Sequence, residues 1–137
     1  MQNVERALQH RHDSRKTLRV TDEYDLQDLL RSLLAIHFDD VSAEEPGPKF
    51  AGSSNRVDLV LRKEGIAIEI KKMRSSLSEA ELGRALKLDI VDYRQRDFDA
   101  LVIVIDVRKG RLKNGKGFVR DLRKVEKGFY VELRILS

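Results

Sequence analysis

The spacing of apolar residues predicts a helix soon after the start of the chain. From residue 21 onward, leucines recur at intervals of three and four and form an apolar stripe made of Leu26, Leu29, Leu30, Leu33 and Leu34. Thr21 is the expected N-cap, because acidic residues fill the turn that follows it. At helical spacing Glu23 falls inside the apolar arc, whereas Asp28 falls on the solvent side.

A β-hairpin is predicted in the next segment. A short candidate strand at residues 41–45 leads into a loop of Pro, Gly and Ser that reaches Asn55. Two strand-like runs follow at residues 56–62 and 66–73, and only Lys63-Glu64-Gly65 separates them. Such a short connection that contains glycine is typical of a tight antiparallel turn.

The turn determines which side chains share a face of this hairpin. If Glu64-Gly65 forms a two-residue loop, Val60 lies opposite Glu69 and Asp58 lies opposite Lys71. Because side chains alternate between the two faces of a strand, Asp58, Glu69 and Lys71 come together on one face. The other face is apolar and consists of Val57, Leu59, Leu61, Ile66, Ile68 and Ile70.

The second half of the chain continues the alternation of helix and strand. Ser78 and Glu81 predict a capping box for a second helix that extends to about Arg96. The apolar run at residues 101–105 predicts a central strand that is covered on both faces. A short helix is expected at residues 118–125. The inward residues of the second helix and of the last strand are Leu82, Leu86, Ile90 and Tyr93, then Phe129, Val131, Leu133 and Ile135.

The predicted order is helix, strand, strand, strand, helix, strand, short helix, strand. This order is typical of an α/β fold in which helices pack around a mixed sheet. A chain of 137 residues fits a single core. We therefore expect a basic N-terminal arm or helix at residues 1–20 and one folded domain at residues 21–137. The arm has no clear apolar face, which also fits the trimmed end of a longer protein.

Composition excludes several classes of site. The chain contains no Cys, so disulfides, zinc–thiolate clusters and thiol catalysis are excluded, and any metal must be bound by oxygen or imidazole. No apolar run approaches the length of a membrane span, and the N-terminus lacks the apolar core of a secretion signal. A cytoplasmic protein without a membrane partner is the resulting expectation.

Charge is distributed unevenly along the chain, although the formal net charge is only +4. Residues 107–137 contain ten Lys and Arg against three acids, and residues 1–20 contain five against two, so the middle of the chain is acidic. Basic ends suit a polyanion, and an acidic centre suits a bound metal. Charge alone nevertheless favours the simpler interpretation of an unevenly charged, solvated surface.

The polar face of the hairpin has two interpretations. Two carboxylates that converge there can bind Mg²⁺, which prefers hard oxygen ligands, and a neighbouring ammonium group can stabilise charge that develops on a phosphate. Alternatively, the hairpin is simply amphipathic and carries a solvated Asp58–Lys71 pair, which contributes ~0–1 kcal/mol. On spacing alone the second interpretation is favoured.

A resemblance to a known family changes that balance. The residues Asn55-Arg56-Val57-Asp58-Leu59-Val60-Leu61, a hairpin, and Ala67-Ile68-Glu69-Ile70-Lys71-Lys72 resemble the PD-(D/E)XK nuclease superfamily, which has a restriction-endonuclease-like αβββαβ core. The resemblance covers roughly Thr21 to Ile105. The stretch from Asp22 to Leu30 also resembles C-terminal nuclease domains of bacterial proteins, some of them linked to phage defence.

The resemblance implies an endonuclease that hydrolyses phosphodiester bonds, with DNA as the expected substrate and Mg²⁺ or Mn²⁺ as the cofactor. It implies that Asp58, Glu69 and Lys71 are catalytic and that Glu23 on the first helix is a further catalytic acid. The implied metal ligands are Asp58, Glu69 and Ile70, of which Ile70 can offer only its main-chain oxygen.

Two expectations concern the second helix. Some relatives place a glutamine near the metal there, whereas this chain has Ala85 and Lys87 in that region, so the resemblance does not supply that role. Asp89 lies among apolar inward residues and is expected to be a capped or ion-paired structural acid. No catalytic role is expected for His10, His12 or His37.

Nucleic acid is the expected partner. The candidates for phosphate contacts flank the hairpin or lie in the glycine-spaced basic loop, and they are Arg56, Lys72, Arg74, Lys109, Arg111 and Lys113. A homodimer is the simple route to double-strand breaks, and membership of a larger multidomain protein is also open. Two alternatives to an active nuclease remain: a nuclease fold that binds nucleic acid or a protein without cleavage, and a basic interaction domain of a larger complex.

Overall fold

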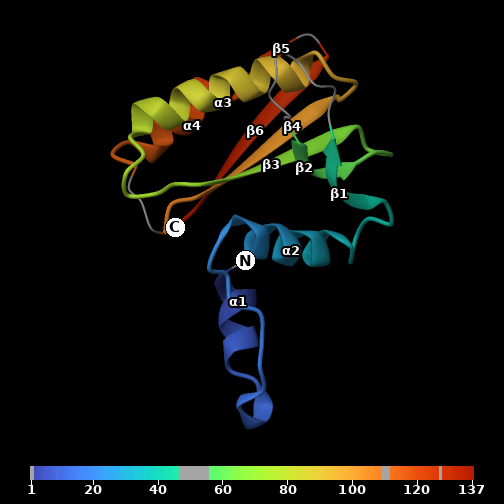
Figure 1. Ribbon diagram of the computed structural model, residues 1–137. Coiled ribbons are helices and arrows are strands. Elements are labelled where there is room, and N and C mark those ends of the chain that lie inside the picture. The colour runs from blue at the N-terminus through green and yellow to red at the C-terminus, as the bar shows by residue number, and fades with distance from the viewer. Residues whose placement is uncertain (1, 47–55, 109–111, 127) are drawn as a thin grey trace.

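The computed structural model describes residues 2–46, 56–108, 112–126 and 128–137 and has an α/β architecture (Figure 1). Six strands form one mixed sheet in the order β1-β2-β3-β4-β6-β5. The chain runs outward along α1 and returns to α2, which covers one face of the sheet, while α3 and α4 cover the other (Figure 1). The predicted mixed sheet flanked by helices is confirmed.

From residue 21 onward the elements follow the predicted order with one strand added, and residues 2–14 contain two further short helices. The helices are α1 (Gln2–Gln9), the short 3-10 helix η1 (His12–Ser14), α2 (Glu23–Leu34), α3 (Glu79–Arg94) and α4 (Gly115–Leu122). The strands are β1 (Val41–Pro46), β2 (Arg56–Leu61), β3 (Ile66–Lys72), β4 (Ala100–Asp106), β5 (Lys124–Glu126) and β6 (Phe129–Leu136). Strands β3, β4 and β6 run parallel, and the other neighbouring pairs are antiparallel. Within the described ranges no helix is long and apolar enough to cross a membrane.

Each face of the sheet has its own apolar core. The core under α2 contains Leu26 together with Leu59, Leu61, Ile68, Ile70 and Val104. The core under α3 and α4 contains Leu82, Leu86 and Tyr93 from α3 together with Leu101, Ile103, Ile105, Val131 and Leu133 from the sheet. Because β4 contributes to both cores, the prediction of a central strand covered on both faces is confirmed.

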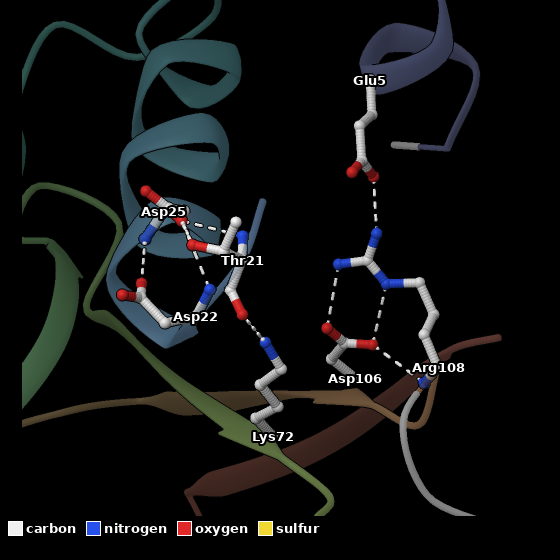
Figure 2. Close-up of polar contacts among 7 residues, drawn as sticks. All are labelled: Glu5, Thr21, Asp22, Asp25, Lys72, Asp106 and Arg108. Carbon is white, nitrogen blue, oxygen red and sulfur yellow. Dashed lines mark hydrogen bonds and ion pairs between the residues drawn. The ribbon is translucent and has the colours of Figure 1, made fainter. Parts of the chain in front are cut away.

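Helix α2 begins one residue later than predicted, so the assignment of Thr21 as N-cap was wrong. Asp22 is the N-cap, because its Oδ1 accepts the Asp25 N–H at 2.9 Å and the Asp25 carboxylate accepts the Asp22 N–H at 3.2 Å (Figure 2). A reciprocal box needs an acceptor three residues after the cap, and Asp25 supplies one for Asp22. The residue three after Thr21 is Tyr24, which cannot do so. Thr21 instead donates its hydroxyl to Asp25 at 2.6 Å.

The hairpin between β2 and β3 has a longer turn than predicted. Leu59 pairs with Ile68 and Leu61 pairs with Ile66, so four residues, 62–65, connect the strands and the predicted register was wrong by two residues. A two-residue turn of the expected type would need a positive φ at Glu64 as well as at Gly65, and only Gly65 has one, at 64°. A shift of two residues does not by itself change any side chain's face. Val57 is an exception to the prediction, because it packs in the core under α3 and α4 and not with Leu59 and Leu61 under α2.

The end of the chain also differs from the prediction. Ser78 and Glu81 form the predicted capping box of α3, but α4 begins at Gly115 rather than at residue 118. The side chain of Asn114 accepts the Gly117 N–H at 3.0 Å and thereby fixes the earlier start. The residues at the end of the predicted short helix form β5 instead, which pairs with β6 at the edge of the sheet.

The N-terminal arm is attached to the domain by polar contacts at two points (Figure 2). Arg108 donates to Glu5 of α1 at 2.5 Å and also forms two bonds of 2.9 Å with the fully buried Asp106 at the end of β4. Lys72 donates to the main-chain carbonyl of Thr21, where the arm leads into α2. The division of the chain at residue 20 stays a prediction.

Candidate active site

The candidate active site lies where β2 and β3 separate. The described pairing between these strands ends at Leu59 and Ile68, although β3 continues to Lys72 alongside β4. Beyond that point the Asp58 side chain takes the place of a β2 main-chain partner, since its Oδ2 accepts the Ile70 N–H at 2.6 Å. The carboxylate of Asp58 is thereby held in the opening of the sheet.

Glu69 is a buried carboxylate with a partner on each oxygen. Its Oε1 lies 2.5 Å from Lys71 Nζ, on the same face of β3. Its Oε2 accepts a hydrogen bond from the hydroxyl of Tyr93, which reaches it from α3. Glu69 is only 6% exposed, so these two partners replace the water that a carboxylate needs.

Lys71 is held between two carboxylates. Besides Glu69, its ammonium group lies 3.2 Å from Asp89 Oδ2 on α3, and the expectation of an ion-paired Asp89 is confirmed. Burial alone would lower the pKa of Lys71, but the charges and hydrogen bonds of Glu69 and Asp89 outweigh burial and raise it above its ordinary value. Lys71 is therefore a fixed positive charge rather than a proton acceptor.

The carboxylates around Asp58 disfavour one another's charge. Burial, then the negative charge of Glu69, and also that of Glu23, raise the pKa of Asp58 from 3.8 to about 7, while the Ile70 N–H and Lys71 act in the opposite direction. Burial likewise raises the pKa of Glu23, and Glu69 adds to that effect. A position where acids are held together at this cost in free energy suits a cation.

An open groove of about 580 Å³ leads to Asp58 from the surface. One wall is the N-terminal part of α2, and the other is the end of β3 with the residues that follow it. The lining residues are Thr21, Asp22, Glu23, Tyr24, Gln27, Asp58, Lys72, Met73, Arg74 and Ser75. Glu23, which was predicted on the inward face of the first helix, therefore lines the same groove as Asp58.

The residues present fit a hydrated divalent ion better than a closed metal cage. Among the described residues, no three His, Asp or Glu side chains converge closely enough to bind a metal by themselves. Mg²⁺ usually takes only one or two carboxylates and retains several waters. Asp58 and Glu69 supply such a pair, and Ile70 can add an oxygen, because the C=O and N–H of a residue in an extended strand point to the same neighbour.

The sequence as a whole matches one family model, that of the DpnII-MboI restriction endonucleases (REase_DpnII-MboI), over residues 1–136. The chain belongs to this family. The family is a restriction-endonuclease-like PD-(D/E)XK family, so the resemblance seen in the motif is confirmed, and the match extends beyond residues 21–105 at both ends. No curated protein and no solved structure matches the chain. As a member of the DpnII-MboI family the protein is a nuclease.

The predicted phosphate-binding residues of this DpnII-MboI family member divide into three groups. Lys72 and Arg74 line the groove at Asp58. Lys113 does not line it, and its main-chain N–H donates to Glu79 at the start of α3. The remaining candidates, which are the Arg56 side chain, Lys109 and Arg111, lie outside the described residues.

The sequence did not reveal that α3 takes part in the site through Tyr93. Tyr93 was predicted only as a core residue, yet its hydroxyl contacts Glu69, and its ring lies 5.0 Å from the Arg96 guanidinium. Ala85 and Lys87, where some relatives have a glutamine, are both exposed. The available signal was the spacing of Asp89 and Tyr93, which places two polar groups one turn apart on the inward face.

Proposed function

We propose that this member of the DpnII-MboI family is a metal-dependent endonuclease that hydrolyses phosphodiester bonds of DNA. The observation that carries the proposal is the opened hairpin, in which Asp58 holds the Ile70 N–H beside the Glu69–Lys71 pair. Mg²⁺ or Mn²⁺ would be bound by the carboxylates of Asp58 and Glu69 and by the Ile70 carbonyl. Such an ion would offset charge on the transferring phosphate and acidify a bound water.

Each residue of the site has a role that follows from its contacts. Lys71 keeps its positive charge, and since Glu69 and Asp89 hold its ammonium group in place, it can stabilise the negative charge that grows on the phosphate during cleavage. Tyr93 fixes the orientation of the Glu69 carboxylate. Glu23, whose pKa is raised by burial, is the nearby group that can take up a proton on the groove side.

Substrate binding would rest on the basic wall of the groove. Lys72 and Arg74 lie next to Asp58, so phosphates of the bound strand can approach the site there. The basic residues of the N-terminal arm and of residues 109–113 would add contacts that carry no sequence information. One site in each chain makes a homodimer the simple arrangement for cutting both strands.

The second candidate function is binding of nucleic acid without cleavage. One observation favours it: both Glu69 oxygens already have partners, Lys71 and Tyr93, so a metal ligand at Glu69 would have to share or release them. The presence of Asp58, Glu69 and Lys71 together favours the active enzyme.

Cleavage of a supercoiled plasmid separates these functions. The native protein and the control Asp28→Asn, which removes an exposed acid on the solvent side of α2, should nick or linearise the plasmid when Mg²⁺ or Mn²⁺ is added. Glu69→Gln should slow cleavage by roughly a hundredfold or more, because it removes a ligand charge, while duplex binding in Ca²⁺ persists. Binding without cleavage in any divalent metal would establish the second function instead.

A further inference from the structure

Helix α2 brings two side chains into the groove that the proposed chemistry does not use. Tyr24 and Gln27 line it together with Asp58, Lys72 and Arg74. They lie on the same part of the helix as Glu23, so they are next to the proposed reaction centre. Neither was singled out by the sequence pattern.

Gln27 is a buried amide whose hydrogen-bonding groups have no partner within the described part of the chain. It is 8% exposed, which is unusual for glutamine, and no described residue donates to or accepts from its side chain. A carboxamide offers two N–H donors and an oxygen acceptor, and those of Gln27 are not among the fully buried atoms of the described residues that have no partner, so the amide is accessible although the residue is mostly buried. The groove is the direction from which a partner can reach this amide.

Tyr24 is the opposite case, a large ring left in solvent. Its residue is 65% exposed, and its ring stacks on no other ring among the described residues. The exposed Tyr130 differs, since its hydroxyl donates to Glu132 at 2.7 Å and supports the edge of the sheet. Among the residues that the structure describes, none makes such a contact with Tyr24, so its ring is available to a ligand in the groove.

Charge determines which part of a nucleotide would face these residues. Two acids of α2 in the groove, Asp22 and Glu23, repel phosphate, whereas Tyr24 and Gln27 beside them are neutral. Lys72 and Arg74, at the end of β3 and after it, attract phosphate, and the Lys72 ammonium group is bound to the Thr21 carbonyl at the start of α2. A strand in the groove is therefore oriented with its phosphates toward Lys72 and Arg74 and its neutral base and sugar toward Tyr24 and Gln27.

We propose that Tyr24 and Gln27 form a nucleoside subsite. The nucleoside next to the phosphate at Asp58 packs against the Tyr24 ring and forms hydrogen bonds with the Gln27 amide. Stacking of a base on an aromatic ring tolerates all four bases, whereas an amide can distinguish base edges. The subsite rests on the proposed function, because that function places the phosphate at Asp58.

Two small probes with the same charges test the subsite. Thymidine 3′,5′-bisphosphate and its abasic analogue, 2-deoxyribose 3,5-bisphosphate, are titrated calorimetrically into the full chain in the presence of Ca²⁺. The native protein should bind the nucleoside probe about tenfold more tightly, the preference that stacking on one ring provides. Tyr24→Ala should lose this preference while binding of the abasic probe stays the same. The control Ile36→Ala removes an exposed apolar side chain just after the C-terminal end of α2, away from the groove. It should retain the preference for the nucleoside probe.

Gln27→Leu adds a readout that a structural role would not produce. Leucine fills a similar volume without an unpaired amide, so its midpoint of urea unfolding should equal or exceed that of the native protein, while the preference for the nucleoside probe falls several-fold. A variant that is strongly destabilised yet keeps the preference would make Gln27 a structural residue and overturn its part in the subsite. Equal binding of both probes by the native protein would overturn the subsite but leave the phosphate site intact. Absence of binding by either probe would overturn the phosphate site and the subsite together.

Discussion

Asp58→Asn should make the metal-free protein more stable although it destroys the proposed metal site. Asparagine has nearly the same shape, and its side-chain oxygen can still accept the Ile70 N–H. What the substitution removes is a negative charge whose pKa is raised to about 7 by burial and by the charges of Glu69 and Glu23. The folded protein therefore binds a proton at Asp58 more tightly than the unfolded chain does.

The sign and size of the effect follow from this shift. Below the unfolded value of 3.8 the group is neutral in both states, and as the pH rises to about 7 the folded state becomes progressively less stable relative to the unfolded one. A shift of about three units corresponds to about 4 kcal/mol at most. Because Asp58 is only partly buried and opens onto the groove, solvent screening reduces this to about 2 kcal/mol.

Urea unfolding without metal, followed by circular dichroism, measures this difference. At pH 8 Asp58→Asn should unfold with a free energy about 2 kcal/mol higher than the native protein, and at pH 4 the two should nearly coincide. Asp28→Asn, the exposed control, should differ from the native protein at neither pH. Added Mn²⁺ should stabilise the native protein and not Asp58→Asn, since only the former binds the ion. A variant less stable than the native protein at pH 8 would refute the reasoning, because Asp58 would then stabilise the fold through its charge.

Three further predictions concern the other parts of the site. Lys71→Ala should lose single-turnover cleavage of a labelled duplex but keep its affinity for the metal and for the duplex in Ca²⁺, because the charge of Lys71 acts mainly in the transition state. Cleavage at the native rate would show that the hairpin is not the catalytic centre. Tyr93→Phe should cost about 1 kcal/mol of stability and raise the Mg²⁺ concentration needed for half-maximal cleavage, and an unchanged Mg²⁺ requirement would mean that Tyr93 does not position Glu69. The affinity for duplex DNA should fall steeply as the salt concentration rises. The dependence of affinity on salt should become weaker in a variant in which Lys109, Arg111 and Lys113 are all neutralised, and an unchanged dependence would place the binding surface elsewhere.

The sequence predicted the faces of the hairpin more reliably than its register. The alternation of Ile66, Ile68 and Ile70 assigns one face to the α2 core whatever the turn, because a shift of two residues changes no side chain's face. The turn itself depends on whether Glu64 accepts a positive φ, and apolar spacing carries no information about that. The predicted partners across the strands were therefore wrong. Glu69 and Lys71 share a face of β3 and form an ion pair, whereas Asp58 lines the groove beside α2.

The contacts that define the site depend on separations that a sequence pattern does not contain. The bond from Ile70 to Asp58 forms because β2 and β3 stop pairing, and the bond from Tyr93 to Glu69 forms because α3 packs on that face of β3. Both pairs are distant in the chain. Asp89 shows the limit well, since its place on the inward face predicted an ion pair but could not name Lys71 as the partner.

The structure also decides against the simplest interpretation of the motif. A solvated cross-strand pair of Asp58 with Lys71 would leave Lys71 on an open surface, whereas its ion pairs are with Glu69 and Asp89 beneath α3. Burying ionised groups costs several kcal/mol each unless they are paired, and apolar residues of similar size often serve stability equally well. Asp58 has no such full compensation, because burial and its neighbours raise its pKa toward neutrality. An acid without full compensation at the mouth of a groove supports our proposal of a cation bound there, and a hydrated divalent ion that also binds a phosphate would supply the missing positive charge.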